Sequence, residues 1–208
     1  MSGNYKGTQS LGDANSEFAA QNAAIRRIIN MMGPNLPAKV LSVSGTGLNP
    51  VGYVTVQPLV HQIDGRGHPT PRGIIHNVPY VRIQGGSRAI ICDPQEGDIG
   101  YIIVSGRDIS TVKAARGEAA PGSFRTHDCA DAVYVGGLLN AAPEEYIGWI
   151  DGDVHVKTAG KFIVDAKEMQ VNCAITASGD VTAGSISLQN HTHPGVQAGS
   201  SSTGAPQG

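Results

Sequence analysis

Short stretches in which apolar residues occupy every second position make up the C-terminal part of the chain. This spacing places the apolar side chains on one face of an extended strand. Glycines separate the stretches and supply the backbone freedom that a corner needs. The pattern therefore predicts a succession of very short strands, at residues 153–157, 161–165, 169–176, 180–183 and 185–189.

One chain of such short strands has too little apolar surface to enclose a core of its own. Three copies wound around a common axis could bury these faces completely, and a closed winding leaves no sheet edge exposed. Residues 151–193 are therefore predicted to form one third of an intertwined trimeric β-helix.

The predicted β-helix ends in a pair of histidines, His191 and His193. On extended chain, residues two apart point the same way. Two neutral nitrogens are too few ligands for most metals, but three symmetry-related copies bring six to the axis. This octahedral set suits a first-row ion such as iron better than tetrahedral zinc. The alternative is a pair of solvated histidines before a flexible tail, since the motif is short. Residues 194–208 are assigned to the tip and the C-terminal tail.

The N-terminal half shows the same alternation in longer segments with β-branched residues and turn residues between them. Five such segments predict an OB-like barrel over residues 38–118. The predicted strands are residues 38–44, 52–59, 77–82, 87–92 and 99–104.

A helical pattern precedes the barrel, with Ser16 as its N-cap and Gly33 at its end. Residues 1–37 are thus predicted to form an arm with a short amphipathic helix, which packs either on its own domain or on a neighbouring chain. Residues 119–150 are predicted to connect the barrel to the β-helix. Trp149, the only tryptophan, lies where a large ring could plug the wide end of a tapering trimer.

Composition supports an all-β protein, because glycine contributes 28 residues and charged residues only 15% of the chain. The net charge of −2 gives no electrostatic reason to expect nucleic acid or an anionic membrane as a partner. The three cysteines form no C-x-x-C pair and are predicted to be buried apolar residues. The sequence has no apolar run of bilayer length and no apolar signal core, so we expect synthesis in a cytoplasm without a cleaved signal.

Candidate chemistry outside the histidine pair is weak. The loop of residues 60–76 carries His61, Asp64, Arg66, His68, Arg72 and His76. Its three histidines and carboxylate could form a second metal site, but a solvated connecting loop is favoured because Pro and Gly fill the gaps. No nucleophile elbow and no paired carboxylates stand out. We therefore predict no catalytic residues, no cofactor-binding residues and no small-molecule substrate, and no enzyme activity.

Two other classes of protein fit the sequence less well. An OB-fold module that binds nucleic acid needs a basic groove with stacking aromatics, whereas this barrel offers only three tyrosines and scattered arginines. A cupin-like metalloenzyme needs a glutamate and a further histidine beyond its His-x-His pair, and neither follows His193.

The order of these parts resembles the baseplate central spike protein of contractile-tailed bacteriophages, the Mu-like baseplate assembly protein V group with its OB-domain relatives. The likeness spans roughly residues 38–195. It is carried by residues 52–59, 77–79, 96–98, 107–109, 131–133 and the terminal 191–195.

The resemblance implies a homotrimer in the tail baseplate of a virion. Its OB domains would form a collar that meets the tail tube or hub proteins, and its β-helix would taper to a needle that pierces the host outer membrane. It also implies one iron ion per trimer, bound octahedrally by His191 and His193 of three chains. Some related spikes carry a lysozyme domain, for which the connector here is too short. The Gly- and Ser-rich residues 196–208 depart from the family pattern.

Overall fold

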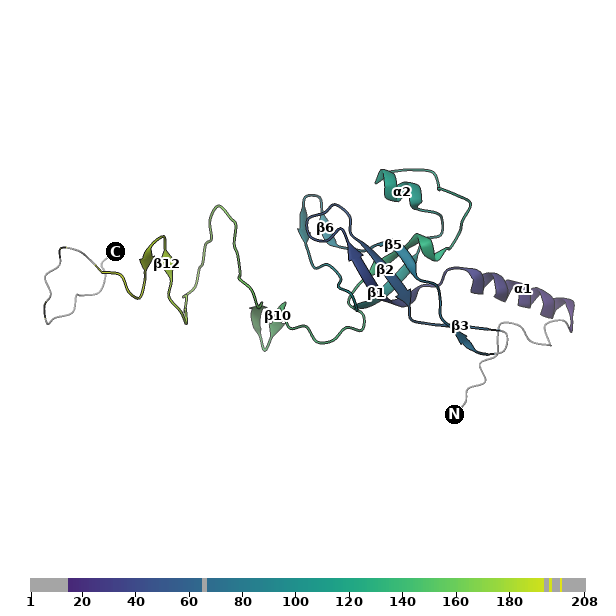
Figure 1. The fold of residues 1–208 in the computed structure, drawn as a ribbon, viewed down its shortest axis with the longest axis horizontal. Helices are drawn as coiled ribbons and strands as arrows, with labels where there is room; N and C mark the ends of the chain where they lie inside the picture. Colours follow the sequence, from purple (N-terminus) through teal and green to yellow (C-terminus); the bar gives the residue numbers. More distant parts are fainter. Residues whose placement is uncertain (1–14, 65–66, 193–194, 196–198, 200–208) are drawn as a thin grey trace, which may run out of the picture. The chain divides into compact units, whose positions relative to one another are not determined.

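A computed structural model describes residues 15–64, 67–192, 195 and 199. The chain divides into two compact units, Met1–Pro143 and Glu144–Gly208. Most of the regular structure is β, with two short helices in the first unit, as the all-β prediction requires (Figure 1). None of the described helices is long and apolar enough to cross a membrane.

Helix α1 (Glu17–Met31) begins where the sequence pattern predicts. The Ser16 hydroxyl accepts a hydrogen bond from the Ala19 amide at 3.1 Å, which satisfies one of the unpaired donors at the helix start. The helix ends before Gly33, whose amide donates to the His127 carbonyl. Its apolar side chains Phe18, Ile25 and Ile28 are exposed in the single chain.

A five-stranded antiparallel sheet forms the body of the first unit, in the order β5-β2-β1-β8-β9 (Figure 1). The sheet is curled, because a parallel bridge between Tyr80 and Tyr134 brings β9 beside the chain that leaves β5. The Val81 amide also donates to the Tyr134 carbonyl at 2.9 Å. The strands are β1 (Leu36–Ser44), β2 (Tyr53–Pro58), β5 (Ile75–Pro79), β8 (Ile99–Val104) and β9 (Ala132–Val135).

The concave face of this sheet holds the core of the unit. Alternate residues of β1, β2, β8 and β9 point inward, and β5 adds Ile75 and Val78, so the sheet encloses an apolar cluster without help from another chain. Two glycines make room for its rings, since a Cβ at Gly52 would clash with Tyr80 and a Cβ at Gly100 would clash with Tyr134. The fully buried apolar residues are Ala38, Val40, Val54, Val56, Pro58, Val78, Ile102, Ala132 and Tyr134.

The fifth strand of the sheet differs from the prediction. Residues 88–90 of the segment predicted as a barrel strand form β7 (Arg88–Ile90), which pairs with β6 (Ile83–Gly85) in a separate exposed hairpin. Gly86, at a φ of +59°, makes the tight turn between them. The position in the sheet is taken by β9, which lies within the predicted connector and buries Ala132 and Tyr134.

Smaller elements surround the sheet. A two-stranded ribbon joins β3 (Gln62–Ile63) to β4 (Pro69–Thr70). Helix α2 (Ser110–Ala115) and the 3-10 helix η2 (Cys129–Asp131) lie in the chain between β8 and β9. The three cysteines are free thiols; Cys129 is partly buried, but Cys92 and Cys173 are exposed in the single chain, so the prediction of burial was wrong for Cys92.

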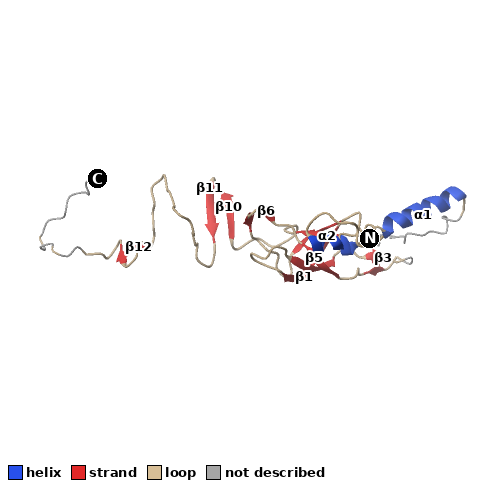
Figure 2. Ribbon diagram, turned by 90° about the horizontal axis from the view of Figure 1, so that it is seen from above, coloured by secondary structure: helices blue, strands red, loops and turns tan. Residues whose placement is uncertain are grey.

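The second unit has little paired structure. Strands β10 (Tyr146–Ile150) and β11 (Asp153–Lys157) form a hairpin, and β12 (Thr182–Ala183) pairs with β13 (Ile186–Ser187). The chain between β11 and β12 is drawn as a loop in Figure 2. The segments 161–165 and 169–176 are thus unpaired in the single chain, which contains no neighbouring strand for them among the described residues.

Candidate functional site

The chain that leads to the histidine pair is held by local hydrogen bonds. The Leu188 amide donates to the Val181 carbonyl at 2.9 Å, and the Gln189 amide donates to Asp180 at 3.1 Å. A hydrogen bond from the Ser187 hydroxyl, followed by one from the Gln189 amide, lowers the pKa of Asp180. This carboxylate therefore stays charged and fixes the turn that follows β13.

His191 follows this turn with its ring turned back toward the chain. Its Nδ1 lies 3.0 Å from the Ser187 carbonyl oxygen and 3.2 Å from the Leu188 carbonyl oxygen. A carbonyl oxygen only accepts hydrogen bonds, so this geometry favours the tautomer with the proton on Nδ1 and the lone pair on Nε2. Metal-binding histidines commonly have this arrangement, in which a backbone carbonyl orients the ring. The His191 side chain thus fits the role of a ligand through Nε2.

His193 lies outside the described residues. The described residues contain no group of three or more His, Cys, Asp or Glu side chains that could hold a metal ion. The predicted site takes two nitrogens from each of three chains, so a single chain supplies only a third of it.

The histidines of the loop at residues 60–76 are not brought into one cluster among the described residues. His68 lies beside Asp64, with 3.1 Å between Nδ1 and the carboxylate, and both side chains are exposed. His76 contacts the Thr55 hydroxyl at 3.4 Å. Arg66 lies outside the described residues.

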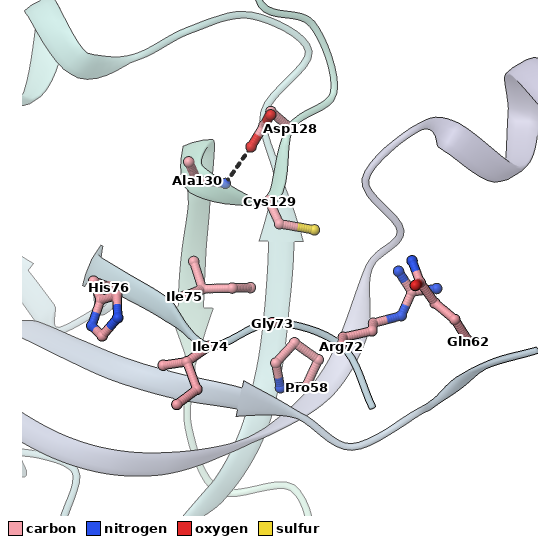
Figure 3. A pocket seen from close by; sticks show the side chains of 10 residues that line it. All are labelled: Pro58, Gln62, Arg72, Gly73, Ile74, Ile75, His76, Asp128, Cys129 and Ala130. Carbon is pink, nitrogen blue, oxygen red and sulfur yellow. Dashed lines mark hydrogen bonds between the residues drawn. The ribbon is translucent and has the colours of Figure 1, made fainter. Parts of the chain in front are cut away.

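A pocket of about 500 Å³ opens beside this loop, between the end of β2, the start of β5 and η2 (Figure 3). Burial raises the pKa of the Cys129 thiol on its wall, which keeps the sulfur protonated and a poor nucleophile. Two hydrogen bonds within the unit hold Arg72 in place. Its carbonyl oxygen accepts from the Gln57 side chain at 2.8 Å, and its side-chain Nε donates to the Val60 carbonyl at 3.1 Å. The side chains that line the pocket therefore have structural roles, and none of these contacts points to a bound ligand.

A charged network that the sequence did not reveal anchors the long excursion between β8 and β9. Asp131 is completely buried and accepts two hydrogen bonds from Arg125, at 2.8 and 3.0 Å. Its carboxylate also accepts from the Ile109 amide at 3.1 Å. The sequence segments 107–109 and 131–133, which carry the family resemblance separately, therefore meet in the fold.

Asp108 extends the same network. The Ser123 hydroxyl donates to it at 2.6 Å and the Ser110 amide at 2.8 Å. Hydrogen bonds from Ser110 and then Ser123 hold the pKa of this carboxyl well below its usual range. Arg125 lies 3.2 Å from Asp108 and pairs with both carboxylates. Its positive charge thus lies against two largely buried carboxyl groups, as buried acids require.

A second network closes the other end of the sheet. The Tyr80 hydroxyl donates to Asp93 at 2.6 Å, and Arg82 lies 2.9 Å from the same carboxylate. Burial alone would raise the pKa of Asp93, but hydrogen bonds from Tyr80, the Gly47 amide and Arg82 together lower it. Arg82 also donates to the Gly45 carbonyl at 2.8 Å, so the network stabilises the β1–β2 loop. Both networks therefore stabilise the folded first unit.

Comparison with known protein families gives one match at the C-terminal end of the chain. The family model described as the GpV Apex motif matches residues 185–207, a range that includes His191 and His193. No curated protein matches the chain. The motif supports a phage baseplate spike protein of the gpV type and is consistent with a location in the virion tail.

Proposed function

We propose that the chain is the central spike of a contractile-tail baseplate and acts as a homotrimer that pierces the host outer membrane. The observation that carries the proposal is the apex motif at residues 185–207, placed at the end of a unit whose apolar side chains stay exposed in a single chain. Large apolar surfaces left open on one chain mark sites of association.

The shaft of the proposed spike is the intertwined β-helix of residues 151–193. Phe162, Ile163 and Ile175 are among its most exposed apolar side chains in the single chain. Two further copies would supply both the covering side chains and the strands to which these unpaired segments hydrogen-bond. A shaft built in this way suits a mechanical load, because withdrawing one chain breaks its ladder with two others.

The first unit is proposed to be an OB-fold collar. Its strand order supports this assignment, because β1, β2 and β5 form a meander, β8 pairs with the other edge of β1, and β9 lies between β8 and the chain after β5. The collar and the N-terminal arm would meet the tail tube or hub proteins. The exposed apolar face of α1 is available for such a contact in the single chain.

The tip is proposed to hold one iron ion per trimer through His191 and His193 of three chains. The orientation of the His191 ring by the Ser187 carbonyl supports this role, because a backbone carbonyl commonly orients metal-binding histidines in this way. Six imidazole nitrogens suit an octahedral first-row ion. The bound ion would supply a cross-link among three chain ends that otherwise fray.

The action that follows from these parts is mechanical. Contraction of the tail sheath would push the tube, and the stiff tip would breach the membrane before DNA follows. No bond is made or broken in this step, so the residues that matter are those that keep the shaft closed and the tip sharp.

Elemental analysis of the purified full-length protein tests the tip. We expect close to one iron ion per three chains, and the loss of that iron in His191→Ala and in His193→Ala. His155→Ala is the matched control, since it removes a histidine of the same unit outside the apex motif, and it should retain the metal. Iron that survives both apex substitutions, or one metal per monomeric chain, would contradict the proposed tip.

The piercing role is tested in the phage that carries the gene. Deletion of residues 151–208 should leave particles that bind cells but fail to deliver DNA. Particles that infect normally without these residues would overturn the proposed function.

A further inference from the structure

The β10–β11 hairpin has two unlike faces. Directly opposed residues of an antiparallel pair share a face, and the register opposes Ile147 to Val156 and Trp149 to Val154. These four residues, here called the hairpin face, form one side, and it carries no polar side chain. The other side has Tyr146 opposite Lys157, Gly148 opposite His155 and Ile150 opposite Asp153. Figure 2 shows the two strands side by side.

The hairpin face is open to solvent in the single chain. Its side chains are 72% exposed at Ile147, 80% at Trp149, 59% at Val154 and 50% at Val156. A two-stranded hairpin alone is marginally stable in water. The other strands described in the same unit are two residues long, too short to cover a hairpin of two five-residue strands. The hairpin therefore needs a cover that the described residues of its own unit do not supply.

We propose that the hairpin face is the joint at which three copies of this chain meet at the root of the shaft, with Trp149 of each copy buried against its neighbours. The inference rests on the proposed homotrimer and names the surface that forms it. The occupant is a second copy of the chain, and a third completes the ring.

The charges on the two faces of the hairpin indicate which face contacts the other copies of the chain. Residues that lie close to a three-fold axis approach their own copies in the other two chains. The hairpin face can meet itself without penalty because it has no charge. The opposite face would bring three copies of Lys157 or of Asp153 together, and like charges in a poorly solvated joint repel. Only the hairpin face is therefore suited to self-association.

The position of the joint gives it a further role in assembly. It lies before the unpaired segment 169–176, in which Met169, Val171, Cys173 and Ile175 alternate with a period of two. A one-residue slip between chains would turn these four side chains to the wrong face. A joint at residues 147–156 would fix the three chains in one register before the β-helix assembles. It also holds the trimer independently of metal at the tip.

Trp149 is the only tryptophan, so its fluorescence reports on this joint alone. The test is acrylamide quenching of the native full-length protein, compared with the same protein in denaturant, with the molar mass measured on the same sample. We expect a trimer with blue-shifted emission and several-fold weaker quenching than in denaturant.

Two matched substitutions on β11 separate the faces. Val156→Glu would place three carboxylates in the joint, so we expect loss of the trimer and quenching of Trp149 as strong as in denaturant. His155→Glu adds the same charge on the opposite face, one residue away. It should leave both the trimer and the protection of Trp149 intact.

Several outcomes would overturn the inference. A wild-type trimer with Trp149 as quenchable as in denaturant would remove this joint and leave the trimeric spike standing. A trimeric Val156→Glu protein would mean that the hairpin face is covered by another part of the same chain, or by nothing. A monomeric wild-type protein would overturn both this joint and the proposed spike. If Val156→Glu yields no folded protein, the quenching of the wild-type trimer decides.

Discussion

The sheet of the first unit and the shaft segments of the second share one sequence pattern and differ in how it is completed. In the sheet, Ile102 is 0% exposed because the curled strands face one another across a core. In the shaft, Ile175 is 73% exposed although it too lies in an alternating segment. An alternating pattern thus specifies which face of a strand is apolar and leaves open which chain covers it.

The glycines of the two units also have different roles. Gly52 and Gly100 of the sheet lie against tyrosine rings, so they are required by packing inside one chain. Gly152 and Gly184 of the second unit have positive φ and no atom near the position of a Cβ. They serve turns, where the left-handed backbone region favours glycine. In the single chain, packing contacts therefore specify the first unit, whereas turns specify the second.

The largest expected effect comes from the sheet core. Ile102→Ala removes a fully buried side chain and should lower the free energy of unfolding of the first unit by about 2–5 kcal/mol. Denaturant unfolding followed by circular dichroism measures this loss. A change below about 0.5 kcal/mol, the size usual for surface positions, would show that the curled sheet does not enclose the core described.

The matched substitution in the shaft is Ile175→Ala. In a single chain it should change stability by no more than about 0.5 kcal/mol, because the side chain is exposed. In the proposed trimer it removes three buried side chains, so the unfolding of the shaft should shift and depend on protein concentration. A shift that is absent at every concentration would leave the shaft without the proposed core.

Arg125→Met should give the next largest loss, because it leaves Asp131 and Asp108 without their shared cation. The guanidinium is partly exposed, so water recovers part of the loss. The melting temperature should fall clearly more than in Arg26→Met, a control at an exposed position of α1. Equal melting temperatures for the two variants would show that the network does not stabilise the fold.

Gly100→Ala tests the close packing of the sheet against Tyr134. The added methyl group should overpack the core and cost about 1–3 kcal/mol in unfolding free energy. Gly73→Ala is the control, because nothing lies near the position of its Cβ. If the two variants unfold at the same denaturant concentration, the Tyr134 ring does not require a glycine at position 100.

Of these changes, acid should have the mildest effect on the first unit. The folded-state pKa values of Asp108 and Asp93 lie below those of the unfolded chain. These groups therefore stabilise the fold above the unfolded pKa of about 3.9, and that contribution is lost as pH falls through the lower folded values. Unfolding measured at neutral pH and below pH ~4 should show this loss, and Asp108→Asn should reduce it. A stability that rises toward acid would contradict the two networks.

Sequence reasoning located the parts that depend on local pattern. The predicted strands at residues 38–44, 52–59 and 99–104 and the helix that begins after Ser16 match the structure, because each has a clear period and clear ends. The match of the apex family model includes the predicted histidine pair, although it does not test metal binding.

The missed features depend on contacts between residues far apart in the chain. Strand β9 has only four residues and lies after a long excursion, so its place beside β8 follows from tertiary packing rather than from its own pattern. The segment at residues 87–92 has similar composition but turns back at Gly86. Nothing in the sequence distinguishes Asp131 from a surface acid. Its burial is compensated by the ion pair with Arg125, which only the folded chain brings close.

The measurement that tests the central claim most directly is the molar mass of the full-length protein in solution, by light scattering over a wide range of dilution. The account predicts three times the mass of one chain, because the apolar faces of the second unit are completed only by other copies. A stable mass of one chain would contradict it, and would mean that the shaft segments find their cover within a single molecule.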